Sequence, residues 1–367
     1  MREGKIALPV LKRSILKNLT PVGRLACGTG VGNDYACTAI QEMSDGVFVG
    51  TLTASCVRIL DVSAEEAYME TVLDCLVAET VGKLSTANVL GTVRIHTANV
   101  TMTLPHALEE EELKVLTAFL NKSLRSYDID PAAGYTTVSE AVKGVCVSLT
   151  LIGEVRLNRE AVDHVKKEDF QKHYSTPAGY RLLDGAEVVV TGQIGIEGTL
   201  LLTRAYREAL CRHYSPSFVR RACEMVQLDV RKAAELAGDC HVPYMHSLAE
   251  GGILGGLWEM AEHCGLGMEA DLKAIPIGQE TVEITEYLNV NPYQLRSGGA
   301  MVMLTEDAKH LLSVLHGEGI DATVIGHMTR GKARILHNKD EIRYLDLPAK
   351  DSIYDAKLQT VSERSTL

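Results

Sequence analysis

The apolar pattern of this chain weakens between Arg156 and Tyr180, and this interruption constrains the fold more strongly than any single motif does. Charged residues accumulate there, and Pro177 and Gly179 stand near its end. A chain of 367 residues also exceeds what one hydrophobic core usually organises. We therefore predict an N-terminal domain at residues 1–155, a linker and domain entry at 156–183, a C-terminal domain at 184–349, and a polar, frayed tail at 350–367.

The first half alternates segments that favour strands with segments that favour helices. Residues 47–53 alternate apolar with small or polar side chains, as a half-buried strand does. A capping box at 63–66 predicts the start of a helix, and the acidic start and basic end of 107–127 match the macrodipole of a second helix. Residues 92–104 and 144–155 have the β-branched, alternating character of strands.

The second half is expected to be richer in helix. We predict strands at 187–191, 301–304, 322–327 and 333–336, and helices at 198–213, 217–236 and 249–264. Thr305 has the side chain of an N-cap for a further helix that ends at His316. The two halves together predict a mixed α+β and α/β architecture.

Composition argues against several classes of protein. The nine cysteines are scattered and never spaced C-x-x-C, so neither a disulfide framework nor a zinc knuckle is indicated. A formal charge of −11 disfavours general affinity for nucleic acid, and no apolar run reaches the roughly 18 residues that a membrane helix needs. Residues 1–19 lack the apolar block of a signal peptide. We expect a cytoplasmic protein with neither nucleic acid nor membrane as a partner.

Three glycine-rich segments are candidate ligand loops, at 28–34, 192–198 and 250–256. In the first, backbone N–H groups can approach a phosphate, and Asp34 can hold Mg²⁺. The last puts flexible glycines near the start of a helix, where anions are favoured. Glycines also make ordinary turns and close helix contacts, so the spacing alone leaves both ligand binding and packing open.

Other kinds of site have little local support. Cys240, His241 and His246 match no standard zinc spacing, and no G-x-S-x-G elbow indicates a nucleophilic serine. Trp258 is expected in the core rather than against a cofactor, because Trp contributes a large buried area.

Taken in order, these segments resemble the aminoimidazole ribonucleotide (AIR) synthetase-like superfamily. The resemblance is closest to the branch that contains the hydrogenase maturation carbamoyl dehydratase and its AIR synthase-related relatives. The similar stretches are residues 4–11, 30–36, 192–199, 245–261 and 291–299. The resemblance implies a two-domain fold in which a β-rich N-terminal domain forms a homodimer through a shared barrel and a C-terminal α/β domain follows.

The same resemblance implies ATP near that dimer interface, with Mg²⁺ held by acidic residues. Enzymes of this family phosphorylate an amide, carboxamide or similar oxygen, or transfer the phosphate itself. Carried over to this sequence, Asp34 is the candidate Mg²⁺ ligand. The implied nucleotide-binding residues are Gly30, Gly32, Asn33, Asp34, Asn88, Gly251 and Gly252.

This chain departs from the family pattern at several acidic positions. Ala54 stands where relatives carry a metal-binding Asp, Val89 follows Asn88 where they carry Asn-Asp, and Ser247 replaces the Asp after a histidine. Residues 133–136 replace a histidine-bearing Gly-Gly loop, and residues 365–367 lack the cysteine that accepts a carbamoyl group. Fewer carboxylates would weaken metal-assisted phosphoryl transfer.

Three functional hypotheses therefore stay open. The first is an ATP-dependent enzyme, either a ligase or dehydratase or a kinase-like phosphotransferase, with a depleted Mg²⁺ site and an unidentified small-molecule substrate. The second is a catalytically inactive, nucleotide-sensing or scaffold dimer that meets another protein of a maturation pathway. The third is metal-independent chemistry that uses His246, Glu250 and Glu197 as acid, base or substrate anchor.

Overall fold

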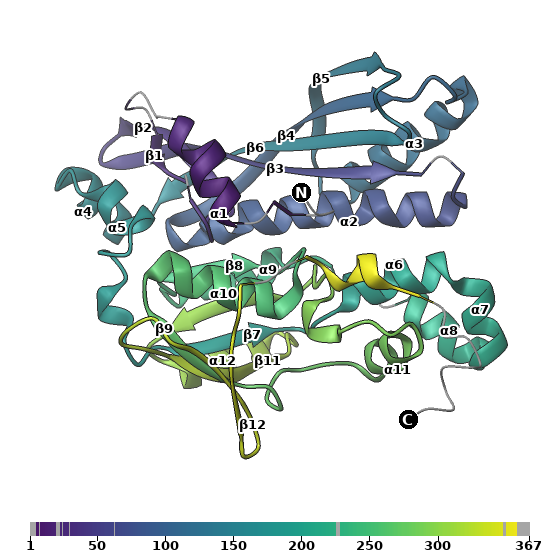
Figure 1. Cartoon of the computed structure of the whole chain (residues 1–367). Coiled ribbons are helices and arrows are strands. Elements are labelled where there is room, and N and C mark those ends of the chain that lie inside the picture. Colours follow the sequence, from purple (N-terminus) through teal and green to yellow (C-terminus); the bar gives the residue numbers. More distant parts are fainter. Residues whose placement is uncertain are drawn as a thin grey trace.

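The computed structural model describes residues 5–6, 8–19, 23, 25–28, 30–61, 63–224, 228–347 and 350–357. Within these ranges the chain forms two layered domains, each built on its own sheet and stacked one above the other (Figure 1). Gly4 of the first resembling stretch, Thr29 of the first glycine-rich segment and residues 365–367 lie outside the described residues.

The first domain is built on a six-stranded sheet in the order β1-β2-β3-β6-β4-β5. Its strands are β1 (Leu25–Cys27), β2 (Ala36–Ser44), β3 (Val47–Leu60), β4 (Gly91–Leu104), β5 (Asp130–Val138) and β6 (Val145–Leu157). All neighbours are antiparallel except β4 and β5, which helix α3 (Glu110–Ser126) connects in parallel. The first glycine-rich segment joins β1 to β2.

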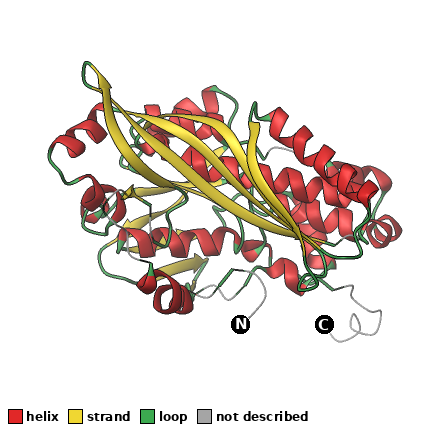
Figure 2. Cartoon of the chain, turned by 90° about the horizontal axis from the view of Figure 1, so that it is seen from above, coloured by secondary structure: helices red, strands yellow, loops and turns green. Residues whose placement is uncertain are grey.

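The two faces of this sheet differ in composition. Along β3, Leu52, Ala54, Cys56 and Leu60 point to the inner face and are buried, whereas Val57 and Ile59 are 54% and 74% exposed on the outer face. The strict alternation of buried and less buried residues in β6 follows the same pleat. Viewed from above, the strands of this sheet lie in front of the helices (Figure 2).

Helix α2 (Glu66–Ser85) lies between this sheet and the helices of the second domain (Figure 1). Fourteen of its 20 residues are buried, so it is enclosed on nearly all sides rather than along one stripe. It carries Glu79 and Lys83 into the domain interface. A short 3₁₀ turn, η3 (Thr86–Val89), follows it.

The segment predicted as a linker is largely helical. It contains α4 (Arg159–Lys166), α5 (Phe170–Ser175) and η4 (Arg181–Leu183). Phe170 and Tyr174 pack into the core of the first domain, and Tyr180 packs into the core of the second. These 25 or so residues therefore connect the two cores as a packed segment.

The second domain is built on a seven-stranded sheet in the order β13-β12-β9-β11-β7-β10-β8. Its strands are β7 (Glu187–Thr191), β8 (Tyr244–Ser247), β9 (Gly267–Asp271), β10 (Met301–Thr305), β11 (Ala322–Thr329), β12 (Arg334–Asn338) and β13 (Glu341–Tyr344). Its helices are α6 (Ile196–Ala205), α7 (Arg207–His213), α8 (Pro216–Cys223), α9 (Arg231–Asp239), α10 (Gly252–Cys264), α11 (Gln279–Tyr287) and α12 (Ala308–Gly317). The short elements α1 (Leu8–Val10), η1 (Leu11–Ile15), η2 (Leu16–Asn18), η5 (Pro292–Gln294) and η6 (Ser352–Asp355) complete the described chain.

Several predicted boundaries are wrong for identifiable reasons. Ser63 donates to the Asp61 carboxylate instead of capping α2, whose N-cap is Glu65. Asp307, not Thr305, caps α12, because its side chain accepts from the His310 N–H. The helix expected at 198–213 divides at Tyr206 into α6 and α7, and the one expected at 217–236 divides into α8 and α9 around undescribed residues 225–227.

The start of the expected tail is also packed rather than frayed. Asp351 is 1% exposed and caps η6 by accepting from the Ile353 N–H. The strands expected at 47–53, 92–104 and 144–155 are confirmed and longer than predicted, whereas β5 occupies a stretch that was assigned to a loop. Among the described residues, none of the helices has the length and apolar character needed to span a lipid bilayer.

Candidate functional site

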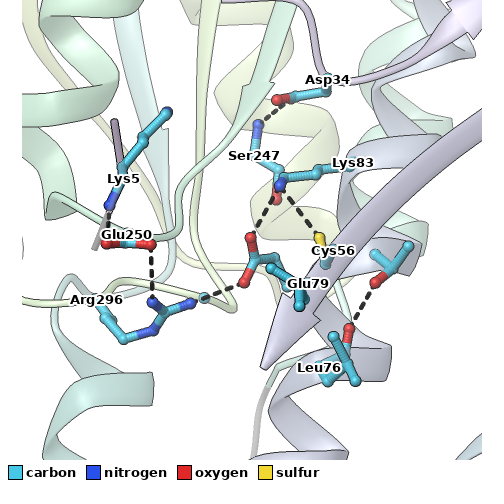
Figure 3. A network of polar contacts seen from close by, with 12 residues as sticks. Lys5, Asp34, Cys56, Leu76, Glu79, Lys83, Ser247, Glu250 and Arg296 are labelled. Atoms are coloured by element: carbon cyan, nitrogen blue, oxygen red, sulfur yellow. Dashed lines mark hydrogen bonds and ion pairs between the residues drawn. The ribbon is translucent and has the colours of Figure 1, made fainter. Parts of the chain in front are cut away.

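A cavity of about 330 Å³ lies between the two domains. The first domain contributes part of the loop between β1 and β2, the middle of β3 and one face of α2. The second domain contributes the end of β8 and the glycine-rich start of α10. Figure 3 shows polar side chains from both domains meeting here. The glycine-rich segments 28–34 and 250–256, far apart in the sequence, are thus brought to one site.

The first glycine-rich loop is fastened to the second domain. The Asp34 carboxylate accepts a 2.7 Å hydrogen bond from the Ser247 N–H, and the Tyr244 hydroxyl donates to the Gly32 carbonyl at 2.9 Å. A Cβ atom on Gly32 would stand 2.7 Å from the Glu259 carbonyl oxygen, so close packing requires glycine there. Asn33 Nδ2 is buried and has no hydrogen-bond partner among the described residues, which leaves both of its N–H donors free for a ligand.

His246 lies between two carboxylates. Its Nδ1 is 2.9 Å from Asp34 Oδ1, an ion-pair contact without the alignment of a good hydrogen bond, and its Nε2 is 3.2 Å from Glu259 Oε2. Burial by itself lowers the pKa of His246, but the two carboxylates outweigh burial and raise it to about 9. Burial likewise raises the pKa of Glu259, but His246 and Lys5 lower it to about 2. At neutral pH the imidazole is therefore a cation and cannot act as a base.

Behind the cavity, a network of buried ion pairs joins the domains. Arg296 of the second domain reaches Glu197 Oε1 at 2.8 Å and Glu79 Oε2 of helix α2 at 2.8 Å. Arg58 of β3 contacts Glu79 and reaches Glu197 Oε1 at 3.0 Å. Each carboxylate is thus shared between guanidinium groups from both domains. Although burial opposes its charge, the pKa of Glu79 is held well below its ordinary range by Arg58, Lys83 and Arg296.

Lys83 carries positive charge from this network toward the cavity. Its Nζ is 2.9 Å from Glu79 Oε1 and donates to Cys56 Sγ at 3.1 Å (Figure 3). Burial and the Glu79 charge raise the pKa of Cys56 to about 11, so the thiol is protonated at neutral pH and is a poor nucleophile. Lys83 and Arg58 both line the cavity as fixed cations.

The second glycine-rich loop is shaped by the end of the described chain. Gly251 and Gly252 have φ of +92° and +62°, and a Cβ on Gly252 would lie 2.6 Å from the Leu295 carbonyl oxygen. The Gly251 N–H donates to Asp351 Oδ2 at 2.7 Å. Burial raises the pKa of Asp351 to about 6, although Arg296 and the two N–H donors oppose that shift. The backbone conformation therefore requires glycine at both positions. The Gly251 N–H, at the start of α10, is already bonded to Asp351.

Most, but not all, of the predicted site residues meet at this cavity. Gly30, Gly32, Asn33, Asp34, Gly251, Gly252, His246 and Glu250 line it. Glu197 lies behind the lining in the ion-pair network. Asn88 is 6% exposed, does not line the cavity and donates to the Ser85 carbonyl at 2.8 Å. Its amide therefore holds the end of α2 against η3.

Sequence reasoning missed Arg58, Glu79, Lys83, Arg296 and Asp351. Each is an isolated charged residue in an apolar or mixed stretch. Such a residue lies on the solvent-exposed surface more often than in a functional site. One signal was available: Glu79 stands in the most uniformly apolar stretch of the predicted helix, where an unpaired acid would be costly.

The carboxylates of the cavity are not arranged as a ready metal site. Among residues that the structure describes, no three His, Cys, Asp or Glu side chains of this cavity have their ligand atoms clustered at metal-binding separation. Asp34 is the one predicted Mg²⁺ ligand, and its carboxylate is engaged by Ser247 and His246. Ala54 lies on the inner face of β3, 5% exposed, where the expected Asp is missing.

Comparison with known proteins agrees with this two-domain arrangement. Residues 184–338 match the family of the AIR synthase related protein, C-terminal domain. A hydrogenase expression/formation protein of Methanocaldococcus jannaschii is 24% identical over 260 residues, covering 70% of this chain and 71% of that protein. The carbamoyl dehydratase HypE of Rhizobium leguminosarum bv. viciae is 28% identical over 148 residues, which span only 39% of this chain and 41% of that relative.

Solved structures match both domains at once. A crystal structure of the hydrogenase maturation protein HypE in complex with ATP has a TM-score of 0.60 at 16% identity, covering 95% of this chain and 94% of that one. AaThiL in complex with AMPPCP and TMP has a TM-score of 0.55 at 17% identity, covering 83% and 87%. A chain of a crystal structure of the HypE–HypF complex has a TM-score of 0.58 at 15% identity, covering 83% of this chain and 93% of that one. These likenesses confirm the predicted AIR synthetase-like fold.

We expect Arg296→Met to lower the free energy of unfolding by about 3–5 kcal/mol, because it leaves Glu79 and Glu197 buried with too little positive charge. Urea denaturation followed by circular dichroism measures the change. Arg343→Met removes the exposed pair with Glu341 and serves as the matched control, with an expected loss below about 1 kcal/mol. Equal losses in the two variants would contradict a structural role for the network.

The raised pKa of His246 predicts a pH-dependent contribution to stability. Its charge stabilises the fold fully below its ordinary pKa of about 6.5, and this stabilisation is lost as the pH rises through about 9. The difference in unfolding free energy between the wild type and His246→Gln should therefore shrink between pH 6.5 and 9.5. His310→Gln, an exposed histidine on α12, is the control. A difference that stays constant over this range would show that His246 is neutral in the folded protein.

Proposed function

Since its second domain is an AIR synthase-related domain, we propose that this protein binds ATP in the cavity between its domains. The observation that carries the proposal is the meeting of the two glycine-rich loops at a cavity that also contains fixed cations and the unpartnered Asn33 amide. Backbone loops of this kind and lysine side chains are common phosphate-binding groups in proteins. The likeness to HypE and AaThiL structures with bound ATP and AMPPCP supports this choice of ligand.

The phosphates would meet mixed charges in this cavity. Lys83 and Arg58 come from the first domain, and Lys5 and Lys350 also line the cavity. Their attraction is offset by Glu79, Glu250 and Glu259. Mg²⁺ bound with the nucleotide would reduce repulsion from these acids, and Asp34 is the predicted side chain to hold it. We therefore propose Mg²⁺ as a partner of the nucleotide rather than as a resident ion.

Of the three candidate catalytic residues, Glu250 is best placed to act on a substrate. Its side chain is 21% exposed at the cavity and is 3.6 Å from Arg296 Nη1. Glu197 is 1% exposed, and it accepts from Arg58, Arg296 and the Gly298 N–H, which suits positioning rather than proton transfer. His246 is a cation and suits anion or oxygen stabilisation. An ATP-dependent ligase, dehydratase or kinase-like reaction on a small molecule is consistent with these roles.

A second candidate function is nucleotide sensing without turnover. It is favoured by Lys83, whose ammonium interacts electrostatically with Asp34, and by Ala54, which stands where the resemblance implies an acid. A fixed cation can neutralise phosphate but cannot supply the open coordination positions of a metal ion. In this alternative, the nucleotide-bound form would contact a maturation-pathway protein, as the HypE–HypF complex does for HypE.

ATP at about 100 times its dissociation constant should stabilise the wild type by about 2.7 kcal/mol, measured as a thermal shift. Lys83→Met should lose most of this shift, because it removes a cation from the cavity, while Lys122→Met on the surface should keep it. Asp34→Asn keeps an acceptor for the Ser247 N–H, so it tests the metal role more cleanly than alanine does.

The Mg²⁺ dependence separates the two functions. A shift that requires Mg²⁺ and falls in Asp34→Asn supports the enzyme. A shift that is equal with and without Mg²⁺ supports the sensor. If the wild type shows no shift under either condition, ATP binding is contradicted.

The outer face of the first sheet is proposed as the homodimer surface. Val57 and Ile59 are exposed there, and Ser55 and Thr150 pair across β3 and β6 at 2.8 Å on the same face. Sedimentation equilibrium should give twice the 39.9 kDa chain mass for the wild type. Thr150→Arg should give the single-chain mass, and Ala118→Arg, at an exposed position of α3, should stay dimeric. A wild type that sediments as one chain at all concentrations would exclude this dimer.

A further inference from the structure

We propose that Glu160, His164 and His173 form a binding site for a divalent transition metal of the Zn²⁺ type, separate from the cavity between the domains. Glu160 and His164 belong to α4, four residues apart and hence on one face of the helix. His173 belongs to α5. Each residue offers one ligand atom, and the three atoms lie within 4.8 Å of one another.

The distances between these ligand atoms fit coordination of one metal ion better than direct hydrogen bonds between the side chains. His173 Nε2 is 3.8 Å from Glu160 Oε1, which is too long for a hydrogen bond. Ligands about 2.0–2.2 Å from a tetrahedral Zn²⁺ are about 3.3–3.6 Å apart. The two imidazole rings stack with centroids 3.7 Å apart and planes inclined by 17°. Since the terminal torsion of histidine is broad, the His173 ring can turn toward an ion beside His164 without any movement of the helices.

Asp169 prepares His164 to be a ligand. His164 Nδ1 is 2.8 Å from Asp169 Oδ1, and a carboxylate only accepts, so Nδ1 carries the proton. The lone pair of the neutral ring is then on Nε2. A carboxylate that orients a histidine in this way is the usual outer partner of a metal-bound imidazole.

The backbone that carries the two histidines is fixed by a turn and by packing. Glu168 adopts a left-handed conformation, with φ of +57°, in the turn between α4 and α5. The His173 N–H then donates to the Asp169 carbonyl at 2.9 Å, which starts α5 beside α4. Tyr174 packs edge-on against both imidazoles, at 5.8 Å and 4.6 Å, and its own ring is 7% exposed in the core. The ligands therefore sit on a packed support rather than on a free loop.

The donor set selects the kind of ion. Two imidazole nitrogens and one carboxylate suit Zn²⁺, Co²⁺ or Ni²⁺, whereas Mg²⁺ and Ca²⁺ prefer oxygen ligands alone. Three protein ligands leave a fourth tetrahedral position for water. Because α4 and α5 connect the two cores, the bound ion would stiffen the segment through which one domain is joined to the other.

The test is titration of the full-length, metal-stripped protein with ZnCl₂ by calorimetry and with CoCl₂ by visible absorption. We expect one equivalent of each ion to bind, and the Co²⁺ complex to show the bands of tetrahedral nitrogen and oxygen ligation. His173→Gln and Glu160→Gln should abolish this binding. Asp169→Asn should weaken it about 10- to 100-fold, because it removes only the orienting partner. MgCl₂ should produce no heat at this site.

His337→Gln is the matched control, because His337 pairs with Glu269 at 3.0 Å on the surface of the second domain. It should bind Zn²⁺ as the wild type does. Glu160 is exposed, so its variant keeps the fold and tests the site even if a histidine variant unfolds. Binding that survives Glu160→Gln and His173→Gln, or a Co²⁺ spectrum with thiolate bands from exposed Cys211, would overturn the proposal. The absence of any binding by the wild type would overturn it as well.

Discussion

The arrangement of the two domains depends on Glu79 and Glu197 sharing the guanidinium groups of Arg58 and Arg296. Removing four charged groups from water is costly, and the cost is recovered only when every charge has close partners of opposite sign. Here each carboxylate comes from one domain and receives a guanidinium from the other. The network therefore specifies how the domains meet, and α2 also packs against α6 and α9 of the second domain. The cavity in front of the network keeps its shape because the walls behind it cannot slide without separating these pairs.

His246 and Lys83 give that cavity an unusual charge distribution for a site that is expected to hold Mg²⁺. The imidazolium neutralises Asp34 and Glu259, and the ammonium neutralises Glu79. Part of the positive charge of the cavity therefore comes from side chains. A bound nucleotide would then contact these side-chain cations in place of some contacts to a metal ion. The cations are already in position, so they need not reorganise when the nucleotide binds. An enzyme would depend on Mg²⁺ for part of the positive charge around the phosphates, whereas a sensor would depend on the side chains alone.

Much of the fold follows from the sequence, because strands β3, β4 and β6 and the glycine-rich loops have local signatures that tertiary packing preserves. Ala54 and Ser247 could also be placed from resemblance alone, and Trp258 is buried as expected, although its ring also borders the cavity. The ion-pair network could not be predicted, since Arg58 and Arg296 meet across 238 positions and each looks like a surface charge by itself. Asn88 is a different case: the resemblance implies a nucleotide-binding role for it, and in the structure its amide donates to the Ser85 carbonyl at the end of α2. Helix caps were misplaced for a related reason, because Ser63 and Thr305 have competing hydrogen-bond partners two residues away, at Asp61 and Asp307.

Gly32 has a consequence beyond its own turn. A side chain at this position would clash, because a Cβ on Gly32 would lie 2.7 Å from the Glu259 carbonyl oxygen and 2.8 Å from His263 Cβ. The loop between β1 and β2 of the first domain thus packs closely against helix α10 of the second domain. If a gene rearrangement joined one domain to the other domain of a distant relative, the new pair would have to reproduce both this close contact and the buried ion pairs. The two domains are therefore expected to descend together through evolution, as a single inherited unit rather than as interchangeable modules.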